Sequence, residues 1–285
     1  MELFLTLSTY TMLLMSVVTY IACSSMTAPY GKFTTSKGWG ICVPARIAWF
    51  IMESPNLWVT AIVYLYYATP ECRANGNNNL LMTLFVLHYI NRSVLYPLRM
   101  PRSSAPMPIT VMLLAFSFCL WNGVQQSVAL GVVQCANNNW GPLDSESDSS
   151  AYLSALRMYL GITLFVLGAI INIHSDQILM NLKTNTAKGR TASMMQRSYD
   201  NSNTNNKRYV IPRGGLFEYV SCANYFGEIV EWSGCALACG TLPALAFAVY
   251  TLSNLAPRAF KQHAWYKQKF EDYPKDRAAV IPFLL

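Results

Sequence analysis

Long apolar blocks dominate this chain, and no other feature of the sequence constrains its fold as strongly. Five stretches are each long enough to cross a bilayer: residues 3–23, 44–68, 79–97, 108–133 and 152–174. A further apolar region, 214–256, has room for two more helices. Apolar runs of about 18 residues or more are typical of transmembrane helices. The sequence therefore predicts an all-α integral membrane protein with about seven transmembrane helices.

The composition supports a membrane protein rather than a soluble one. Of the 285 residues, 53% are hydrophobic and only 12% are charged, against roughly 25% charged in an ordinary soluble domain. So few charges cannot cover the surface of a soluble protein of this length. No basic segment precedes the first block and no small-residue cleavage site is obvious after it, so 3–23 is predicted to be a retained span.

The basic residues predict an orientation. Lysine and arginine gather in 24–43, 98–107, 175–213 and 257–285, whereas 69–78 has one and 134–150 has none. The positive-inside rule then predicts a lumenal N-terminus and a cytosolic C-terminus. An even number of crossings is needed after residue 213, so we expect helices near 215–232 and 235–256, with a tight turn at Ser233 and Gly234.

Two further interpretations follow from the charged and polar loops. The basic loops are ordinary topogenic charge that can touch anionic lipid, so membrane lipid is an expected partner and nucleic acid is not. The stretch 184–206, rich in Asn, Thr, Ser and Lys, is predicted to be a disordered cytosolic insertion.

Polar residues recur at helical spacing inside the apolar blocks, where an ionisable group costs ~2.5–3.5 kcal/mol. Four groups share a face within a helix: Arg46, Trp49 or Phe50, and Glu53; Tyr89, Arg92 and Tyr96; Asn172 and Asp176; Asn224, Glu228 and Glu231. Interhelical hydrogen bonds average only ~0.6 kcal/mol, too little to favour burying so many acids. We therefore expect these faces to meet in a polar cavity open to the cytosol.

Several residue types and motifs exclude other chemistry. Asn122 and Gln125 stand alone and are interpreted as residues that hydrogen-bond between helices, and His88 is interpreted as a packing residue. The sequence has no Walker motif, no GxGxxG after a strand and no serine-nucleophile elbow. Its eight cysteines include no CxxC pair and its three histidines lack ligand spacing, so no metal site is predicted. Pro55, which closely follows Glu53, removes a backbone donor and is predicted to loosen or kink its helix. A transporter stays an alternative because buried acids and a helix-breaking proline occur there too, although no internal repeat supports it.

Six segments, spread from residue 28 to near the end of the chain, resemble one known family. They are APYGKF (28–33), IAWFIMESPNLW (47–58), HYINRSVLYPLR (88–99), INIHSD (171–176), IPRGGLFEYVSCANYFGEIVEW (211–232) and WYKQKFEDYPKDRAAVIPF (265–283). In this order they resemble the steroid 5α-reductases, or 3-oxo-5α-steroid 4-dehydrogenases. The MESP and YPLRMPRSS motifs are most similar to those of plant members of the brassinosteroid pathway.

The resemblance implies NADPH-dependent reduction of the Δ4 double bond of a 3-oxo-Δ4-steroid. Conjugate hydride addition to an enone develops negative charge on the carbonyl oxygen, which a hydrogen-bond donor stabilises. Tyr89 can donate to that oxygen, and Glu53, kept protonated in a site of low dielectric, can act as a second donor. Both are predicted to be catalytic, and Trp49 is predicted to bind the substrate.

The resemblance also implies a division of the chain. Residues 1–135 are expected to form the steroid pocket and residues 136–285 to form the reductase domain that binds NADPH. The residues carried over as cofactor contacts are Asn172, Asp176, Lys183, Tyr209, Asn224, Glu228, Tyr266 and Tyr96. Lys183 stands where the family often has arginine, and a lysine keeps the charge but loses the planar fork.

The expected location is the endoplasmic reticulum membrane, crossed several times, with no obligate protein partner evident. Two alternatives to the steroid reductase remain open at this point. One is a related membrane reductase acting on enoyl or polyprenyl compounds. The other is a non-enzymatic sterol-binding or transport protein built on the same bundle.

Overall fold

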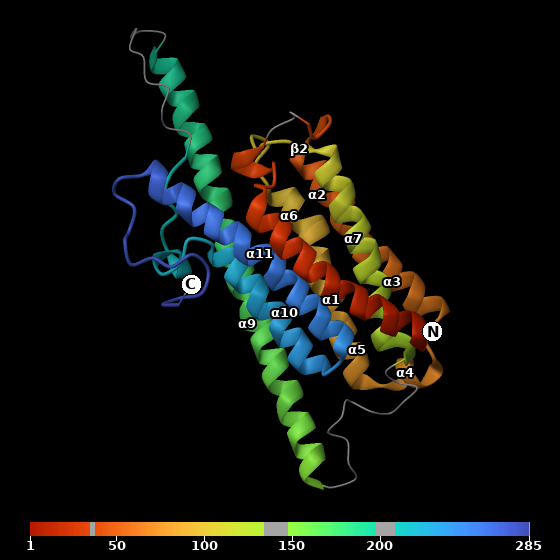
Figure 1. Ribbon diagram of the computed structural model, residues 1–285. Coiled ribbons are helices and arrows are strands. Elements are labelled where there is room, and N and C mark those ends of the chain that lie inside the picture. The colour runs from red at the N-terminus through yellow and green to blue at the C-terminus, as the bar shows by residue number, and fades with distance from the viewer. Residues whose placement is uncertain (35–37, 134–147, 198–208, 285) are drawn as a thin grey trace.

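The computed structural model describes residues 1–34, 38–133, 148–197 and 209–284, and these residues are mostly helical (Figure 1). In this part of the chain the strands are limited to β1 (Cys42–Val43) and β2 (Met107–Pro108), which pair antiparallel. This two-stranded ribbon joins the segment after the first apolar block to the segment before the fourth. The prediction of an all-α fold is confirmed.

Each apolar block forms one helix or a broken pair of helices. The first five blocks give α1 (Glu2–Ser25), α2 (Ala45–Glu53) with α3 (Pro55–Tyr66), α5 (Gly76–Ile90), α7 (Ile109–Val128) and α9 (Asp148–Arg197). The last region gives α10 (Ala223–Cys239) and α11 (Leu242–Lys269), and short helices α4 (Pro70–Ala74) and α6 (Tyr96–Arg99) lie between the others. Among the residues that the structure describes, three helical segments are long and apolar enough to cross a membrane: Glu2–Ser25, Ile109–Val133 and Tyr152–Asn185.

Helix breaks fall beside proline residues. The second block breaks at Ser54, directly before Pro55, as predicted, because proline has no N–H to continue the helical ladder. After α5 the chain widens into a π-helical turn, Asn91–Leu95, before Pro97 of α6. Such π-helical turns occur often at functional sites.

Two predictions about the C-terminal half differ from the structure. The turn predicted at Ser233 and Gly234 is wrong: α10 runs through both residues and ends at Gly240, whose φ of 61° provides a left-handed C-terminal cap. The predicted disordered insertion 184–206 is helical up to Arg197, where α9 ends, and its remainder lies outside the described residues.

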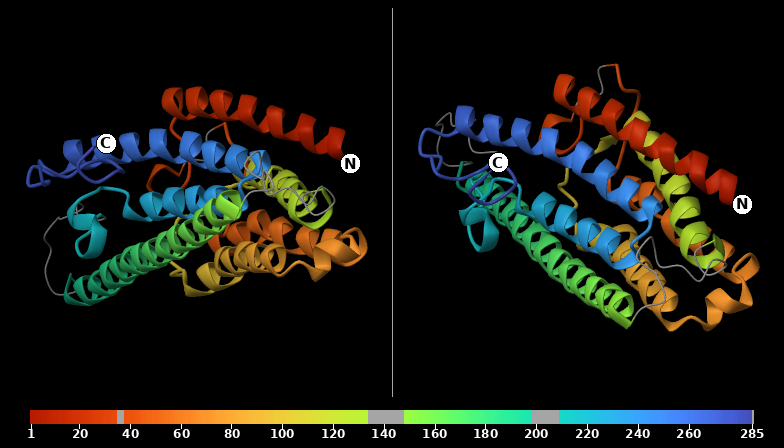
Figure 2. Two further views of the ribbon diagram at one scale, coloured as in Figure 1. Left: turned by 90° about the horizontal axis from the view of Figure 1, so that it is seen from below. Right: turned by 60° about the horizontal axis from the view of Figure 1, so that its bottom comes forward.

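The helices stack in layers around α10. Figure 2 shows α10 lying between α9 on one side and α11 on the other, with α1 packed on the outer side of α11, and the contacts between these helices agree. The helices α2 and α3 pack on α7, and α5 lies beside α3. This order brings α2, α5, α7, α9 and α10 around a shared interior.

Glycines allow the backbones of α9 and α10 to touch. Gly161 and Gly168 on α9, and Gly227 and Gly234 on α10, each repeat after seven residues and so lie on one face. A Cβ added at Gly168 would lie 2.3 Å from the Glu231 amide nitrogen, and one added at Gly234 would lie 2.4 Å from the Phe165 amide nitrogen. Closely packed small residues are a common basis of helix association in membranes.

Gly234→Ala is therefore expected to destabilise the protein by ~1–3 kcal/mol, the usual cost of overpacking. The new methyl group would meet backbone atoms, which cannot rotate away. The measurement is the thermal unfolding midpoint in detergent. Gly76→Ala is the matched control because nothing lies within 4 Å of its added Cβ, so its midpoint should be unchanged or slightly higher. Equal midpoints for the two variants would contradict the close packing.

Candidate active site

A buried arginine joins three of the polar helix faces. Arg92, in the π-helical turn, lies 3.4 Å from Asp176 Oδ2 on α9, 3.8 Å from Glu228 Oε2 on α10 and 3.9 Å from Glu53 Oε1 at the end of α2. Only 8% of Arg92 is exposed. The faces predicted to meet do meet, and Arg92 is the residue on which they converge.

Two aromatic rings cover the Arg92 guanidinium. Its central carbon lies 4.6 Å from the centroid of the Trp49 ring and 5.1 Å from that of Tyr96. The two rings contact each other edge to face, with centroids 4.9 Å apart. Cation–π contacts of this kind hold a desolvated cation in place. Trp49 and Tyr96, predicted to contact substrate and cofactor respectively, are thus neighbours in one cluster.

The helix α7 holds Glu53 and Tyr89 side by side. Cys119 donates its S–H to Glu53 Oε2 over 3.6 Å, and Asn122 donates from Nδ2 to the Tyr89 hydroxyl oxygen over 3.3 Å. Residues three apart share a helix face, so both predicted catalytic residues contact the same face of α7. Because the Tyr89 oxygen accepts from Asn122, its own O–H is left to donate.

Asn122 belongs to a buried amide network between helices, which confirms its interpretation as an interhelical hydrogen-bonding residue. It also donates to Asn56 Oδ1 and accepts from Gln126 Nε2, each at 3.3 Å. Gln126 donates in turn to the Pro243 carbonyl oxygen at 3.0 Å. The network fixes the rotamer of Asn122, and through it the direction of the Tyr89 hydroxyl. Nothing in the sequence indicated that this network reaches Tyr89.

The predicted residues Asn172, Asp176 and Asn224 form one cluster where α9 meets the start of α10. Asn172 Nδ2 donates to the Asn224 carbonyl oxygen over 2.9 Å, and Asn224 Nδ2 donates to Asp176 Oδ1 over 3.1 Å. Lys183, two turns further along α9, interacts electrostatically with Asp176. Gly227 permits this approach because a Cβ there would lie 2.5 Å from the Asn172 amide nitrogen.

Tyr266 and Tyr209 lie in a separate aromatic cluster at the C-terminal end. Both rings contact Trp265, each with centroids 5.2 Å apart, and Tyr266 stacks on Tyr273 at 5.4 Å. The described contacts do not join these residues directly to the Arg92 cluster. Tyr266 lies on α11, which packs against α10, the helix that carries Asn224 and Glu228.

A lysine that the predictions did not include completes this aromatic cluster. Lys32 Nζ lies 3.6 Å from the Trp265 centroid and 4.1 Å from that of Tyr266, and it is buried without a hydrogen-bond partner. Burial lowers the pKa of the Lys32 amine to about 7, because desolvation disfavours the charged form. The APYGKF segment was the only signal in the sequence that could have identified it.

Glu218, in the same C-terminal half of the chain, lies beside two arginines. It accepts from the Gly214 backbone N–H at 2.6 Å and lies 3.4 Å from Arg213 Nη1 and 3.6 Å from Arg277 Nη2. The Gly214 hydrogen bond and the neighbouring arginines hold the pKa of the Glu218 carboxyl below its usual value. Arg277 is 2% exposed. The C-terminal end therefore holds an unusual number of buried cations beside stacked rings.

Comparison with known proteins identifies the family. Residues 105–285 match the family model of 3-oxo-5-alpha-steroid 4-dehydrogenases. A 3-oxo-5-alpha-steroid 4-dehydrogenase 1 of Bos taurus is 39% identical over 272 residues, which cover 95% of this chain and 93% of the relative. The chain belongs to the 3-oxo-5-alpha-steroid 4-dehydrogenase family. It is thus a member of a family of oxidoreductases, and the predicted resemblance is confirmed.

Plant and other animal members of the steroid dehydrogenase family are similar to the same extent. A steroid 5-alpha-reductase of Arabidopsis thaliana is 40% identical over 263 residues, covering 90% of this chain and 87% of the relative. The 3-oxo-5-alpha-steroid 4-dehydrogenase 1 of Homo sapiens is 39% identical over 242 residues, covering 85% and 81%. The MESP and YPLRMPRSS motifs indicated the plant branch. These identities do not distinguish the plant branch from the animal branch.

Proposed function

We propose that this protein reduces the Δ4 double bond of a 3-oxo-Δ4-steroid to the 5α-reduced 3-oxo-steroid, with NADPH as the reductant. The observation that carries the proposal is the meeting of Glu53 and Tyr89 on one face of α7, beside the Arg92 cluster. Membership of the family supplies the substrate class. The geometry of the donors supports the reaction type.

The two donors would act on the substrate carbonyl oxygen. Tyr89, with its oxygen accepting from Asn122, would aim its O–H at that oxygen and stabilise the charge that develops there. Glu53 would serve as the second donor in its protonated form. Three carboxyl groups surround the single Arg92 cation, and burying uncompensated charge is costly, which favours a retained proton. Trp49, packed against Arg92, would border the steroid.

The cations of the C-terminal end fit an anionic cofactor. Lys32 Nζ, Arg258 Nε and Arg277 Nε are buried without hydrogen-bond partners, and a pyrophosphate would provide acceptors for such groups. Bound NADPH would supply the hydride. Tyr266 and Tyr209 would contribute aromatic surface, and Asn172, Asp176, Asn224 and Glu228 hydrogen-bonding groups, with Lys183 and Tyr96 as further contacts. In this arrangement residues 1–135 contribute the steroid site, and residues 136–285 contribute the cofactor site together with Lys32 and Tyr96.

The test of this function is reduction by the purified protein. NADPH consumption should depend on an added 3-oxo-Δ4-steroid, with a product that has gained two hydrogens. An equal rate with NADH at low concentration would contradict the cofactor assignment. Steroid binding without NADPH consumption would favour the sterol-binding or transport alternative, and consumption with an enoyl thioester or polyprenyl compound alone would favour the related reductases.

Lys32→Met is expected to weaken NADPH binding by about tenfold to a hundredfold, because hydrogen bonds to charged groups contribute ~1.5–3 kcal/mol. With a pKa of about 7, the wild-type amine is charged below this pH, so NADPH affinity should fall as the pH rises through 7. This pKa lies below that of an unfolded lysine, which is 10.5. Burial of Lys32 therefore lowers the free energy of unfolding by its full amount below pH 7, and this destabilisation becomes smaller as the pH rises from 7 to 10.5. Lys32→Met should therefore raise the unfolding midpoint of the ligand-free protein at neutral pH while it weakens binding.

Calorimetric titration with NADPH measures the affinity. Lys267→Met is the matched control because Lys267 is exposed on α11, and it should bind NADPH like the wild type. A Lys32→Met protein with unchanged affinity and an unchanged pH profile would remove Lys32 from the cofactor site.

We further propose seven crossings of the endoplasmic reticulum membrane with a lumenal N-terminus and a cytosolic C-terminus. The uneven distribution of lysine and arginine supports this orientation. A protease applied to sealed microsomes should cleave within 184–206 from the cytosolic side. Protection of that segment, with cleavage at 134–150 instead, would reverse the proposed orientation.

A further inference from the structure

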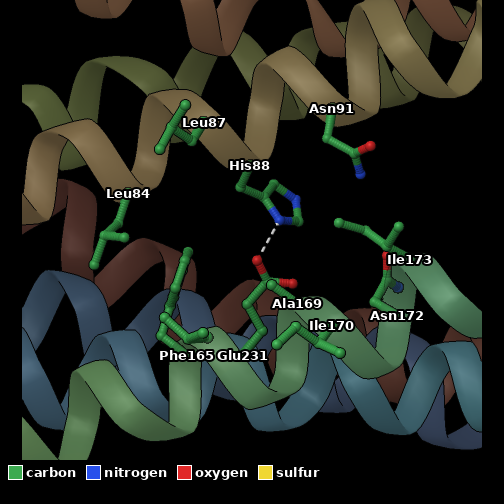
Figure 3. Close-up of a pocket in the computed structure, with 11 residues that line it drawn as sticks. Leu84, Leu87, His88, Asn91, Phe165, Ala169, Ile170, Asn172, Ile173 and Glu231 are labelled. Carbon is green, nitrogen blue, oxygen red and sulfur yellow. Dashed lines mark hydrogen bonds and ion pairs between the residues drawn. The ribbon is translucent and has the colours of Figure 1, made fainter.

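A cavity opens between α5 and α9, with His88 and Glu231 among the residues that line it. Its volume is about 200 Å³, and its walls include Leu84, Leu87, Phe165 and Ile170 (Figure 3). Leu87 and Ile170 are 55% and 58% exposed, so the mouth of the cavity lies among apolar side chains on the outside of the bundle. The cavity is therefore open to an apolar ligand that arrives from the surrounding membrane.

Two polar side chains that contact each other, His88 and Glu231, lie among the mostly apolar residues that line this cavity. His88 Nδ1 lies 2.7 Å from Glu231 Oε1, and Glu231 is 1% exposed. The second carboxylate oxygen, Glu231 Oε2, is buried and has no hydrogen-bond partner. Figure 3 shows it turned away from His88. A buried carboxylate oxygen without a donor is costly, and native structures rarely contain one without a functional reason.

The other carboxyl groups of the interior do not share this feature. Glu228, one turn before Glu231 on α10, faces Arg92, as do Glu53 and Asp176. Glu231 instead faces α5 and contacts His88. The acid of this cavity thus differs from those that face Arg92, although Asn172, which also lines the cavity, borders the Asp176 cluster and His88 is next to Tyr89 in the chain.

We propose that this cavity binds a small apolar alcohol, or the hydroxyl-bearing end of a larger one, whose O–H donates to Glu231 Oε2. The apolar walls match a hydrocarbon body, and the unpaired acceptor, Glu231 Oε2, matches one donor. A ketone or an ether presents only acceptors and would leave the Glu231 oxygen unsatisfied. This preference is the reverse of that proposed for Glu53 and Tyr89, which offer donors to a carbonyl oxygen.

The probe is an octanol that carries a diazirine, photolysed with the purified protein, with the labelled residues mapped by mass spectrometry. Labelling should concentrate on the parts of α5 and α9 that line the cavity. Unlabelled 1-octanol should compete for this labelling at least about tenfold better than octyl methyl ether, because only the alcohol can donate a hydrogen bond to Glu231 Oε2.

Two variants separate the cavity from general apolar binding. Ala169 lines the cavity, and Ala169→Leu should reduce the labelling at least about tenfold by filling it. Ala155→Leu is the matched control, on an exposed position of the same helix, and should leave labelling unchanged. In Glu231→Gln, the carbonyl oxygen can keep the His88 contact while the amide N–H₂ faces the cavity, so the preference for octanol over the ether should disappear.

Equal labelling of Ala169→Leu and Ala155→Leu would overturn the proposal, and so would equal competition by octanol and the ether on the wild type. The second comparison needs no variant, so it decides the question even if Glu231→Gln does not fold. Neither readout uses NADPH or steroid turnover, so failure here leaves the proposed reductase function untouched.

Discussion

Tyr89→Phe should slow steroid reduction by about 10²–10³-fold, the usual effect of removing one donor to a developing oxyanion. The substitution keeps the ring, which packs between Phe85 and Trp232. Asn122 loses Tyr89 as an acceptor but keeps Asn56 Oδ1 at 3.3 Å, so its amide is not left without a partner. We therefore expect the variant to fold and to bind NADPH like the wild type. The measurement is turnover normalised to cofactor-bound protein.

Tyr64→Phe is the matched control for this experiment. The Tyr64 hydroxyl donates to Asn79 Oδ1 at 2.9 Å, so Tyr64→Phe also loses a hydrogen bond, here a partly buried one, but neither residue belongs to the site. Its normalised turnover should be close to that of the wild type. If Tyr89→Phe behaves in the same way, Tyr89 is a packing residue and the catalytic assignment fails.

Variants of Glu53 extend the same comparison. Glu53→Gln retains a donor of similar shape, whereas Glu53→Ala removes the donor and leaves a cavity next to Cys119 and Arg92. The loss of turnover should therefore be smaller in Glu53→Gln than in Glu53→Ala. A purely structural role would instead lower the unfolding midpoint of both and leave their normalised turnover nearly unchanged.

Arg92→Met is expected to have the largest effect on stability, ~3–5 kcal/mol or loss of the folded protein. Removal of one partner from a buried ion pair leaves the others uncompensated, and Arg92 faces Glu53, Asp176 and Glu228 together. The unfolding midpoint in detergent, followed by tryptophan fluorescence, measures this effect. Arg92→Lys keeps the charge but not the planar fork that reaches several carboxylates, so its midpoint should fall between those of Arg92→Met and the wild type.

A second substitution tests whether charge is the cause. Asp176→Asn removes one of the uncompensated carboxylates, so adding it to Arg92→Met should restore part of the lost stability, which a double-mutant cycle would detect. Arg73→Met, at an exposed position, serves as the control and should be nearly neutral. An Arg92→Met midpoint equal to that of Arg73→Met would show that the cluster does not hold the helices together.

The sequence predicted well those residues whose energetic effect depends on their own helix alone. Glu53 stood out because an acid inside an apolar block needs an explanation, whatever surrounds it. Pro55 correctly predicted a helix break, because the missing N–H acts within one turn. By contrast, the turn that the sequence predicts at Ser233 and Gly234 is wrong. A glycine in a sequence does not show whether it bends the chain or allows a neighbouring helix to approach closely. The backbone of α9 next to Gly234 decides that.

The sequence by itself determined the all-α fold, the family, and the polar faces of the helices, because hydropathy and spacing along one helix are local properties of the chain. Only the tertiary structure decided which faces meet. Arg92 contacts Asp176, 84 residues away along the chain, and no periodicity encodes such a distance. The same holds for Asn122, which positions Tyr89, and for Glu231, whose second oxygen lacks a partner only because of how α5, α9 and α10 pack. Which side chains form hydrogen bonds or ion pairs with each other depends on burial and on the positions of the other helices, and a single helix does not specify these.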